Sequence, residues 1–196
     1  MNICIYGAGA IGGWIGLALA PTGTRLNVVA RGATLDALQH NGLQLHEDGQ
    51  TITAAVQASA SPVALGVQGF VIVAVKAPAL AAVARQIAPL IGPQTIVLTA
   101  MNGVPWWFFH GFGAALAGTQ LSTIDPTGEI EHAIPAAHVV GCVVHASCSV
   151  DAPGVIRHHF GNGLIIGEPS GGQTERVAQL AQVLNAAGFN ASVSAQ

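Results

Sequence analysis

Six residues near the start of the chain have the spacing of a phosphate-binding loop. The run Gly7-Ala8-Gly9-Ala10-Ile11-Gly12 follows an apolar stretch, residues 2–6, and leads into small and apolar residues. Gly7 permits a tight turn, Gly9 lacks the Cβ that would hold a pyrophosphate away from the backbone, and Gly12 allows a helix to pack closely on the strand. Free N–H groups at the start of that helix attract phosphate oxygens. This pattern predicts a dinucleotide-binding loop; the alternative is a glycine-rich turn that binds nothing.

An arginine occupies the place where an acidic residue usually indicates NAD. Residues 26–30 form the second predicted strand, and Arg31 follows Gly12 by 19 residues. In NAD-binding units a carboxylate about 20 residues after the glycines binds the ribose hydroxyls. A guanidinium instead offers a planar set of donors that matches phosphate oxygens. Arg31 therefore favours NADP over NAD, and the alternative is a solvated surface arginine.

Two further polar residues follow predicted strands. Lys76, the one lysine of the sequence, ends the apolar run 70–75, and Asn102 follows the run 95–100. In an open α/β sheet, ligands bind outside the carboxyl ends of the parallel strands. The glycine loop, Arg31, Lys76 and Asn102 are therefore predicted to line one crevice. For Lys76 the alternative is an ordinary solvated lysine at a strand end.

The elements that must position these residues alternate between strand and helix. The fold class predicted is α/β, a Rossmann-type doubly wound, mainly parallel sheet with a mixed β extension. We expect one domain, residues 1–196, made of a nucleotide-binding core, 1–118, and a β-rich extension with a last helix, 119–196. Predicted helices cover residues 13–20, 33–40, 79–90 and 175–187, with Thr174 as a cap, and residues 43–54 form a hairpin. Later β segments are predicted as short pieces at 139–147, 154–158 and 164–167, with a last strand at 189–194, while Glu129 and Glu131 are expected in a polar loop.

Composition limits the partners that the protein can have. Hydrophobic residues make up 51% of the chain, charged residues 8%, and the net charge is −3. Soluble domains usually contain about 25% charged residues, so apolar surface is expected to meet another domain or a second copy, as a homo-oligomer. Scattered basic residues argue against nucleic acid, and apolar runs that stop short of ~18 residues argue against a membrane span. With no leader at Met1, we expect a cytoplasmic protein with reduced thiols.

Other chemistries find little support in the pattern. Cys142 and His145 resemble half of a metal site, but no second ligand pair occurs at zinc spacing, so no metal is expected. His158 and His159 are adjacent in a strand, so at most one could face a site. No serine-hydrolase elbow occurs. The aromatic run 106–109 is expected in the core or at an interface.

The whole chain resembles the amino-terminal domain of the ketopantoate reductases, also called 2-dehydropantoate 2-reductases. Single motifs are loose, but their order along one chain is specific. The residues that carry the resemblance are the glycine loop, Ala30-Arg31-Gly32, Val75-Lys76-Ala77, Asn102-Gly103-Val104-Pro105, Val144-His145-Ala146, Pro153-Gly154-Val155-Ile156-Arg157-His158 and Gly163-Leu164-Ile165-Ile166-Gly167-Glu168-Pro169.

The resemblance implies NADPH-dependent reduction of ketopantoate to pantoate, a step of pantothenate and coenzyme A biosynthesis. It implies that Gly7, Ala8, Gly9, Ala10, Ile11 and Gly12 hold the pyrophosphate and that Arg31 binds the 2′-phosphate. Lys76 is implied to contact the cofactor, and Asn102 to lie where cofactor and substrate meet. Ser147 is implied to lie in a loop near the nicotinamide.

One departure from the family bears on activity. In the family, a lysine in a second, helical domain donates the proton, and the resemblance places Lys76 on the cofactor side instead. We therefore expect these 196 residues to be a truncated form that lacks the helical domain, to bind NADP(H), and to be inactive alone. The alternatives are a non-catalytic NADP(H)-binding sensor or scaffold, and a reductase of another 2-oxo acid.

Overall fold

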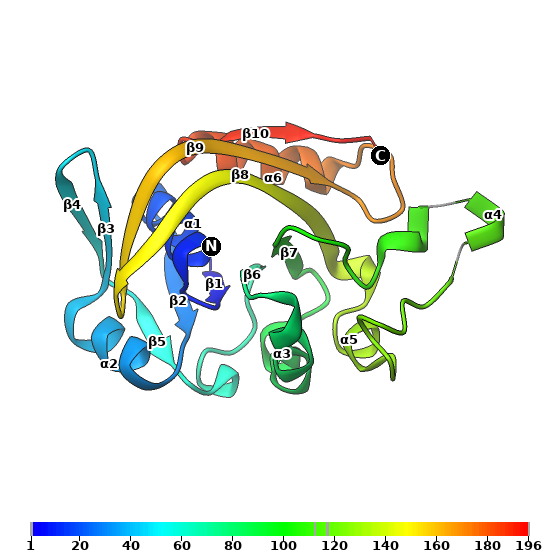
Figure 1. The fold of residues 1–196 in the computed structure, drawn as a ribbon, viewed down its shortest axis with the longest axis horizontal. Coiled ribbons are helices and arrows are strands. Elements are labelled where there is room, and N and C mark those ends of the chain that lie inside the picture. The colour runs from blue at the N-terminus through cyan, green and yellow to red at the C-terminus, as the bar shows by residue number, and fades with distance from the viewer. Residues whose placement is uncertain (1, 112, 117, 196) are drawn as a thin grey trace.

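One mixed sheet runs through the whole molecule. The computed structural model describes residues 2–111, 113–116 and 118–195. The sheet has the strand order β4-β3-β9-β8-β7-β6-β1-β2-β5, and β10 pairs with β9 beside this path (Figure 1). The strands are β1 (Asn2–Tyr6), β2 (Arg25–Val29), β3 (Leu43–Glu47), β4 (Gln50–Ala54), β5 (Gln57–Ser59), β6 (Phe70–Val73), β7 (Ile96–Ala100), β8 (Val139–Ala152), β9 (Val155–Gly167) and β10 (Asn190–Val193).

The parallel part of the sheet has the topology of a nucleotide-binding fold. Neighbouring strands from β5 through β2, β1, β6 and β7 to β8 are all parallel. The chain reverses direction across the sheet between β1 and β6, which is the switch point at which such folds bind ligands. Tyr6 pairs with both Val29 and Val73, and Val73 pairs with Thr99. The carboxyl ends of these strands therefore lie level at one edge.

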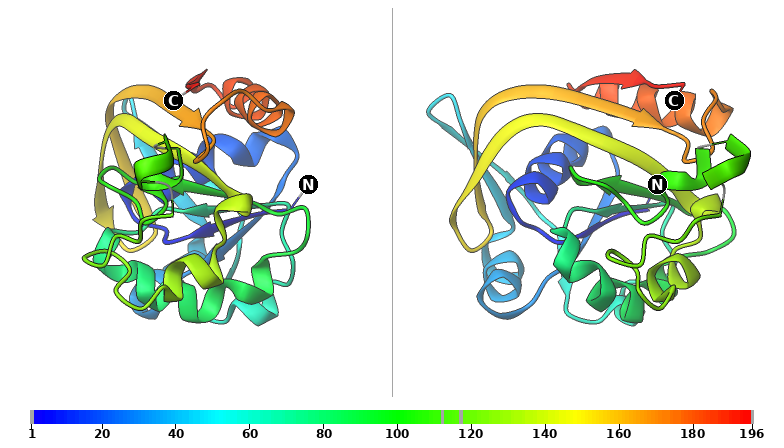
Figure 2. Two further views of the ribbon diagram at one scale, coloured as in Figure 1. Left: turned by 90° about the vertical axis from the view of Figure 1, so that its right-hand side faces the viewer. Right: turned by 45° about the vertical axis from the view of Figure 1, so that its right-hand side comes forward.

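Helices cover both faces of the sheet, which makes it doubly wound (Figures 1 and 2). Ile3 and Ile5 of β1 point into the cluster that contains α1 and α6, whereas Cys4 and Tyr6 point into the cluster that contains α3 and α5. This alternation is the period of two expected for a strand buried on both sides. The helices are α1 (Ala10–Leu19), α2 (Gly32–Asn41), α3 (Leu80–Ile87), α4 (Gly113–Leu116), α5 (Glu129–Ala133) and α6 (Glu175–Ala186), with 3-10 turns η1 (Ala20–Thr22), η2 (Pro62–Ala64), η3 (Ala77–Ala79), η4 (Ala88–Leu90), η5 (Phe108–Gly111) and η6 (Ala136–His138). No helix in the described part of the chain is both long and apolar enough to cross a membrane.

The prediction of short β segments after residue 139 was wrong. β8 has 14 residues and β9 has 13, and the two form one long antiparallel hairpin that arches over α1 (Figure 1). The register shifts three times between them, so β-bulges absorb the polar and glycine-rich residues that interrupt the apolar pattern. Gly161, with φ +83°, lies where an added Cβ would be 2.6 Å from the carbonyl oxygen of His145.

Two other expectations need correction. Glu129 and Glu131 belong to the short helix α5 and not to a loop. Asp125 holds this helix start, because its buried carboxylate, 2% exposed as a residue, accepts hydrogen bonds from the N–H groups of Ile130 and Glu131. The prediction also omitted β5, which continues the parallel sheet beyond β2. The cap of α6 is as expected: Thr174 Oγ1 accepts from the N–H of Val177 at 3.4 Å.

Candidate active site

The glycine loop joins β1 to α1 with the backbone geometry that its sequence predicts. Gly7 has φ +99°, which favours glycine, and its N–H donates to the carbonyl of Val29 at 3.4 Å. A Cβ on Gly12 would lie 2.2 Å from the carbonyl oxygen of Gly7 and 2.9 Å from Cβ of Ala74. A Cβ on Gly9 would meet no atom within 4 Å. Gly12 therefore serves helix packing, whereas Gly9 faces open space.

The start of α1 is suited to an anionic ligand. Gly9 is the N-cap residue, so no side chain caps the helix, and its first turn contains no acidic residue. The first N–H groups of a helix lack partners within the helix and carry partial positive charge. Together with the space in front of Gly9, they fit a pyrophosphate group.

Arg31 stands at the carboxyl end of β2, where it precedes α2. It is exposed, and its guanidinium donates a hydrogen bond of 3.3 Å to Oε1 of Gln86 on α3. Burial raises the pKa of the Tyr6 phenol, and the neighbouring Arg31 guanidinium opposes that rise. The Tyr6 hydroxyl has no partner of normal hydrogen-bond geometry among the described residues. Arg31 thus lies beside the end of β1, between α2 and α3.

Lys76 and Asn102 follow β6 and β7. Lys76 is exposed, and within the described ranges its ammonium makes no hydrogen bond or ion pair, while its carbonyl accepts from the N–H of Ala79 at 2.8 Å. Asn102 is bonded on both sides of its amide: Nδ2 donates to the carbonyl of Val144 at 3.0 Å, and Oδ1 accepts from the N–H of Val144 at 2.9 Å. Asn102 thereby continues the pairing of β7 with β8 by one side chain.

Ser147 does not lie in a loop, which corrects that expectation. It is inside β8, partly buried, paired with Phe160 of β9, and flanked by register shifts on both sides. The three-residue run from His145 to Ser147 is therefore strand with a bulge. Bulges often occur beside functional sites because they redirect a side chain.

The remaining candidates come together because the strands that precede them are parallel and adjacent. The glycine loop follows β1, Arg31 follows β2, Lys76 follows β6 and Asn102 follows β7. These four strands are neighbours in the order β2-β1-β6-β7, and their register is level. The sheet therefore places all four groups along one edge, in the order Arg31, glycine loop, Lys76 and Asn102.

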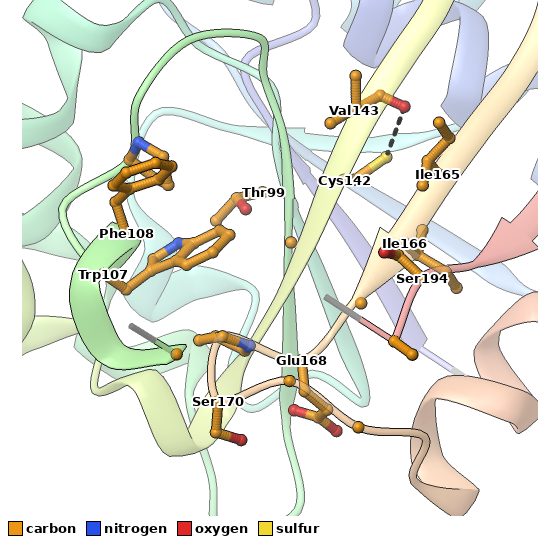
Figure 3. Close-up of a pocket in the computed structure, with 18 of the residues that line it drawn as sticks. Thr99, Trp107, Phe108, Cys142, Val143, Ile165, Ile166, Glu168, Ser170 and Ser194 are labelled. Carbon is orange, nitrogen blue, oxygen red and sulfur yellow. Dashed lines mark hydrogen bonds between the residues drawn. The ribbon is translucent and has the colours of Figure 1, made fainter. Parts of the chain in front are cut away.

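The structure contains a large pocket that the sequence did not predict (Figure 3). It has a volume of about 790 Å³ and includes Met101 and Gly103, the two neighbours of Asn102. The Trp107 ring forms one wall and lies on Gly141, where a Cβ would be 2.5 Å from the ring. Val143 and Ile165 supply apolar surface from β8 and β9 (Figure 3). The pocket is built from four separate segments, residues 99–111, 141–143, 165–172 and 194–195, so no local motif could have indicated it.

Several charged residues elsewhere in the molecule are paired with one another. On the hairpin, Asp151 binds Arg157 and lies 3.0 Å from Nδ1 of His46, and these partners lower the pKa of the Asp151 carboxyl, Arg157 most. His158 pairs with Glu47. The His158 ring stacks on Trp14, with ring centroids 5.4 Å apart.

The ion pair of Glu168 with Arg176 differs from these because its carboxylate is buried. The Glu168 side chain is 4% exposed, binds Arg176, and accepts from the Thr174 hydroxyl at 2.5 Å. Arg176 is the largest cause of the lowered pKa of Glu168, and burial opposes it. This pair ties the end of β9 to the start of α6.

The thiols and the histidines do not suggest another chemistry. Burial raises the pKa of Cys4 and of Cys142 to about 12, and that of Cys148 to about 11. Such thiols stay protonated and unreactive near neutral pH. Among the residues described, no group of three or more His, Cys, Asp or Glu side chains is placed to hold a metal ion.

Comparison with known proteins gives a consistent result. The family model "Ketopantoate reductase PanE/ApbA" matches residues 3–106. A 2-dehydropantoate 2-reductase of Mesorhizobium japonicum is 50% identical over 194 residues, which are 98% of this chain and 60% of that protein. A 2-dehydropantoate 2-reductase of Halobacterium salinarum is 27% identical over 200 residues, 100% of this chain and 58% of its own length. The chain thus spans about 60% of the length of these relatives.

Solved structures share the fold over almost the whole chain. A crystal structure from Ralstonia solanacearum, described as that of a ketopantoate reductase candidate, has a TM-score of 0.95 and 55% identity, covering 98% of this chain and 60% of that one. A ternary structure of D-mandelate dehydrogenase with NADH and anilino(oxo)acetate has a TM-score of 0.80 at 22% identity, covering 99% and 57%. The second likeness is one of fold alone.

Proposed function

The chain belongs to the ketopantoate reductase family, and from this premise we propose that it binds NADP(H) as the cofactor-binding part of a 2-dehydropantoate 2-reductase. The observation that supports this most strongly is the level edge of β2, β1, β6 and β7, where Arg31, the glycine loop, Lys76 and Asn102 lie side by side. A bound nicotinamide cofactor would supply the hydride that reduces a 2-oxo acid to a 2-hydroxy acid.

Each group at this edge has a proposed role that fits its surroundings. The N–H groups at the start of α1 bind the pyrophosphate, and Arg31 binds the 2′-phosphate. Lys76, which has no partner among the described residues, adds a positive charge beside the cofactor phosphates or ribose. Asn102 keeps one N–H and one lone pair free after bonding Val144, enough to orient a nicotinamide amide or a substrate carboxylate. Ser147 contributes from the bulge of β8.

The proposal separates cofactor binding from turnover. Lys76 is the one lysine of the 196 residues and is assigned to the cofactor, so the proton for the product alkoxide has no lysine donor among them. We propose that the 196-residue chain binds NADP(H) but does not reduce ketopantoate, and that the reductase needs residues beyond these. A non-catalytic NADP(H)-binding module is the second candidate, since the same edge supports it equally.

One titration and one assay test these statements. Fluorescence titration of the chain should give tighter binding of NADPH than of NADH, and Arg31→Gln should reduce the affinity for NADPH alone. Equal affinity of the unchanged chain for the two cofactors would contradict the role of Arg31. Oxidation of NADPH in the presence of ketopantoate should stay at the background rate. Turnover at a rate of ~1 s⁻¹ or more, ordinary for an enzyme, would contradict both the inactivity and the binding-module candidate.

We propose ketopantoate as the substrate, with another 2-oxo acid as the alternative. Ketopantoate follows from the family, whereas a different 2-oxo acid is the second candidate because D-mandelate dehydrogenase, solved with NADH and anilino(oxo)acetate, has the same fold. Comparing ketopantoate with phenylglyoxylate in binding to the NADPH complex distinguishes the two. Saturable binding of ketopantoate alone supports the first candidate, and preference for the aromatic acid supports the second.

Self-association is the proposed use of the exposed apolar surface on the hairpin. Phe160 is 70% exposed, and Val143, Val150 and Ile165 are also exposed on β8 and β9. Apolar patches of this kind commonly mark interfaces. Light scattering should find an assembly larger than one chain, and Phe160→Ser should shift it towards the monomer. A wild-type chain that stays monomeric at high concentration would contradict this use.

A further inference from the structure

The five arginines of the chain fall into two groups by their partners. Three pair with carboxylates: Arg85 with Glu129, Arg157 with Asp151, and Arg176 with Glu168. The other two, Arg25 and Arg31, bond to the neutral amide oxygens of glutamines. A guanidinium on a neutral acceptor is held in place while its positive charge stays uncompensated, whereas a carboxylate partner would offset that charge.

The two glutamine-bound arginines stand at opposite ends of the same strand. Arg25 begins β2 and donates to Oε1 of Gln57 on β5 at 2.6 Å. Arg31 comes two residues after Val29, the last residue of β2, and donates to Oε1 of Gln86 on α3 at 3.3 Å. All four side chains belong to exposed residues. The strand therefore carries one such pair at the edge proposed to bind cofactor and one at the edge away from it.

Gln86 holds Arg31 from an element that is remote in sequence. The hydrogen bond joins residues 55 apart and reaches from the end of β2 to the last turns of α3. Arg31 also lies beside the buried Tyr6 hydroxyl, which is neutral. Immediately before Gln86 in the sequence, Arg85 is bound to Glu129, so the one carboxylate paired at this part of α3 is already engaged. Arg31 is thus positioned by neutral groups alone.

We propose that Gln86 is a positioning residue that holds the Arg31 guanidinium as an uncompensated charge at the edge of the sheet and thereby sets the preference for a 2′-phosphorylated cofactor. This inference rests on the proposed function. A glutamate at position 86 would pair with Arg31 and repel the 2′-phosphate. This glutamate would weaken the binding of NADPH and leave the binding of NADH unchanged, because NADH has no 2′-phosphate.

The test is a set of cofactor titrations on the 196-residue chain and its variants. Gln86→Glu should weaken NADPH binding roughly three- to tenfold, the scale of one exposed ion pair plus the repulsion of a phosphate, and leave NADH binding within about twofold. Raising the salt concentration should shrink that loss, because the interactions are screened. Gln86→Ala, which removes the hydrogen bond without adding charge, should weaken NADPH binding by about twofold.

Gln57→Glu is the matched control. It makes the same chemical change, adds the same negative charge, and faces Arg25 at the opposite end of β2 from Arg31. It should leave the ratio of NADPH to NADH affinity unchanged. Thermal unfolding should show that both exposed glutamate variants stay folded, so altered binding does not reflect lost structure.

The outcomes separate this inference from the function on which it rests. Equal binding of NADPH and NADH by the unchanged chain overturns the role of Arg31, and the role of Gln86 with it. A chain that prefers NADPH while Gln86→Glu keeps the same ratio overturns Gln86 alone. So does an equal loss for both cofactors, or the same loss in Gln57→Glu, because either result would indicate a general effect of charge or structure.

Discussion

Charged side chains at the carboxyl edge of the parallel strands differ from those on the long hairpin. At the carboxyl edge of the parallel strands, Arg31 donates a hydrogen bond to the neutral amide of Gln86, and Lys76 has no partner among the described residues. On β8 and β9 and at their ends, Asp151, Arg157 and His158 lie in ion pairs. Paired charges stabilise the protein by binding one another, whereas unpaired charges remain available to an anionic ligand. The contrast leaves positive charge uncompensated at the carboxyl edge, where we propose that the cofactor binds.

The largest loss of stability is expected from a methyl group added at Gly12, where α1 packs against the glycine loop. Gly12→Ala should lower the free energy of unfolding by about 3 kcal/mol, because the new Cβ would lie 2.2 Å from the backbone oxygen of Gly7. Urea denaturation measures this loss. A stability within about 0.5 kcal/mol of the unchanged chain would contradict the close packing of α1 on β1.

Gly9→Ala is the counterpart on the side of the loop that faces open space. No atom lies within 4 Å of the added Cβ, so the free energy of unfolding should change by less than about 1 kcal/mol, the scale of an N-cap substitution. Binding of NADPH should weaken nonetheless, because the methyl group occupies the proposed pyrophosphate position. Unchanged NADPH binding would place the pyrophosphate elsewhere.

The next largest effect belongs to the enclosed pair at the end of β9. Glu168→Gln should cost about 2–3 kcal/mol, because it leaves the Arg176 guanidinium without its carboxylate. Glu129→Gln, which removes the partner of a well-exposed Arg85, should cost less than about 1 kcal/mol. Chemical denaturation of the two variants compares them. Similar losses would show that burial does not strengthen the Glu168 pair.

Acid unfolding is a second test of whether the ion pair of Glu168 stabilises the protein. Its folded pKa is lowered from the ordinary value of 4.5, so its contribution is complete above that value and is lost as the pH falls through the lower folded pKa. The unchanged chain should therefore lose stability below about pH 4.5 more steeply than Glu168→Gln. Identical pH profiles would contradict the ion pair as a source of stability.

A smaller loss is expected where β7 ends. Asn102→Ala removes both hydrogen bonds to Val144 and should cost about 1–2 kcal/mol. Asn102→Asp keeps the acceptor but turns a carboxylate oxygen towards the carbonyl of Val144, so it should cost at least as much. An aspartate variant as stable as the unchanged chain would show that these bonds do not hold β7 to β8.

The smallest effect on stability should come from the unpaired charge. Lys76→Gln should change the free energy of unfolding by less than about 0.5 kcal/mol, because no described residue depends on the ammonium. It should still weaken NADPH binding. A loss of stability without a loss of NADPH binding would show that Lys76 stabilises the fold and does not bind the cofactor.

Apart from β5, the parallel strands β1, β2, β6 and β7 were predictable because each is a local apolar run followed by a turn signal. Gly7, Arg31 and Lys76 could be assigned to strand ends for that reason, and the α/β class is confirmed. β8 and β9 were not predicted at full length, since their pairing depends on a partner strand and on bulges such as that at Ser147. The hydrogen bond from Arg31 to Gln86 joins residues 55 apart and leaves no trace in either local sequence.

We infer that one cofactor contacts the ends of four strands at a single edge of the sheet. The most direct measurement is the change in backbone amide NMR shifts of the 196-residue chain on addition of NADPH. The predicted result is that shifts move together at the glycine loop, Arg31, Lys76 and Asn102, while Arg25 and Thr95, at the amino ends of β2 and before β7, stay still. Changes confined to one strand end, or centred on the amino edge, would contradict it.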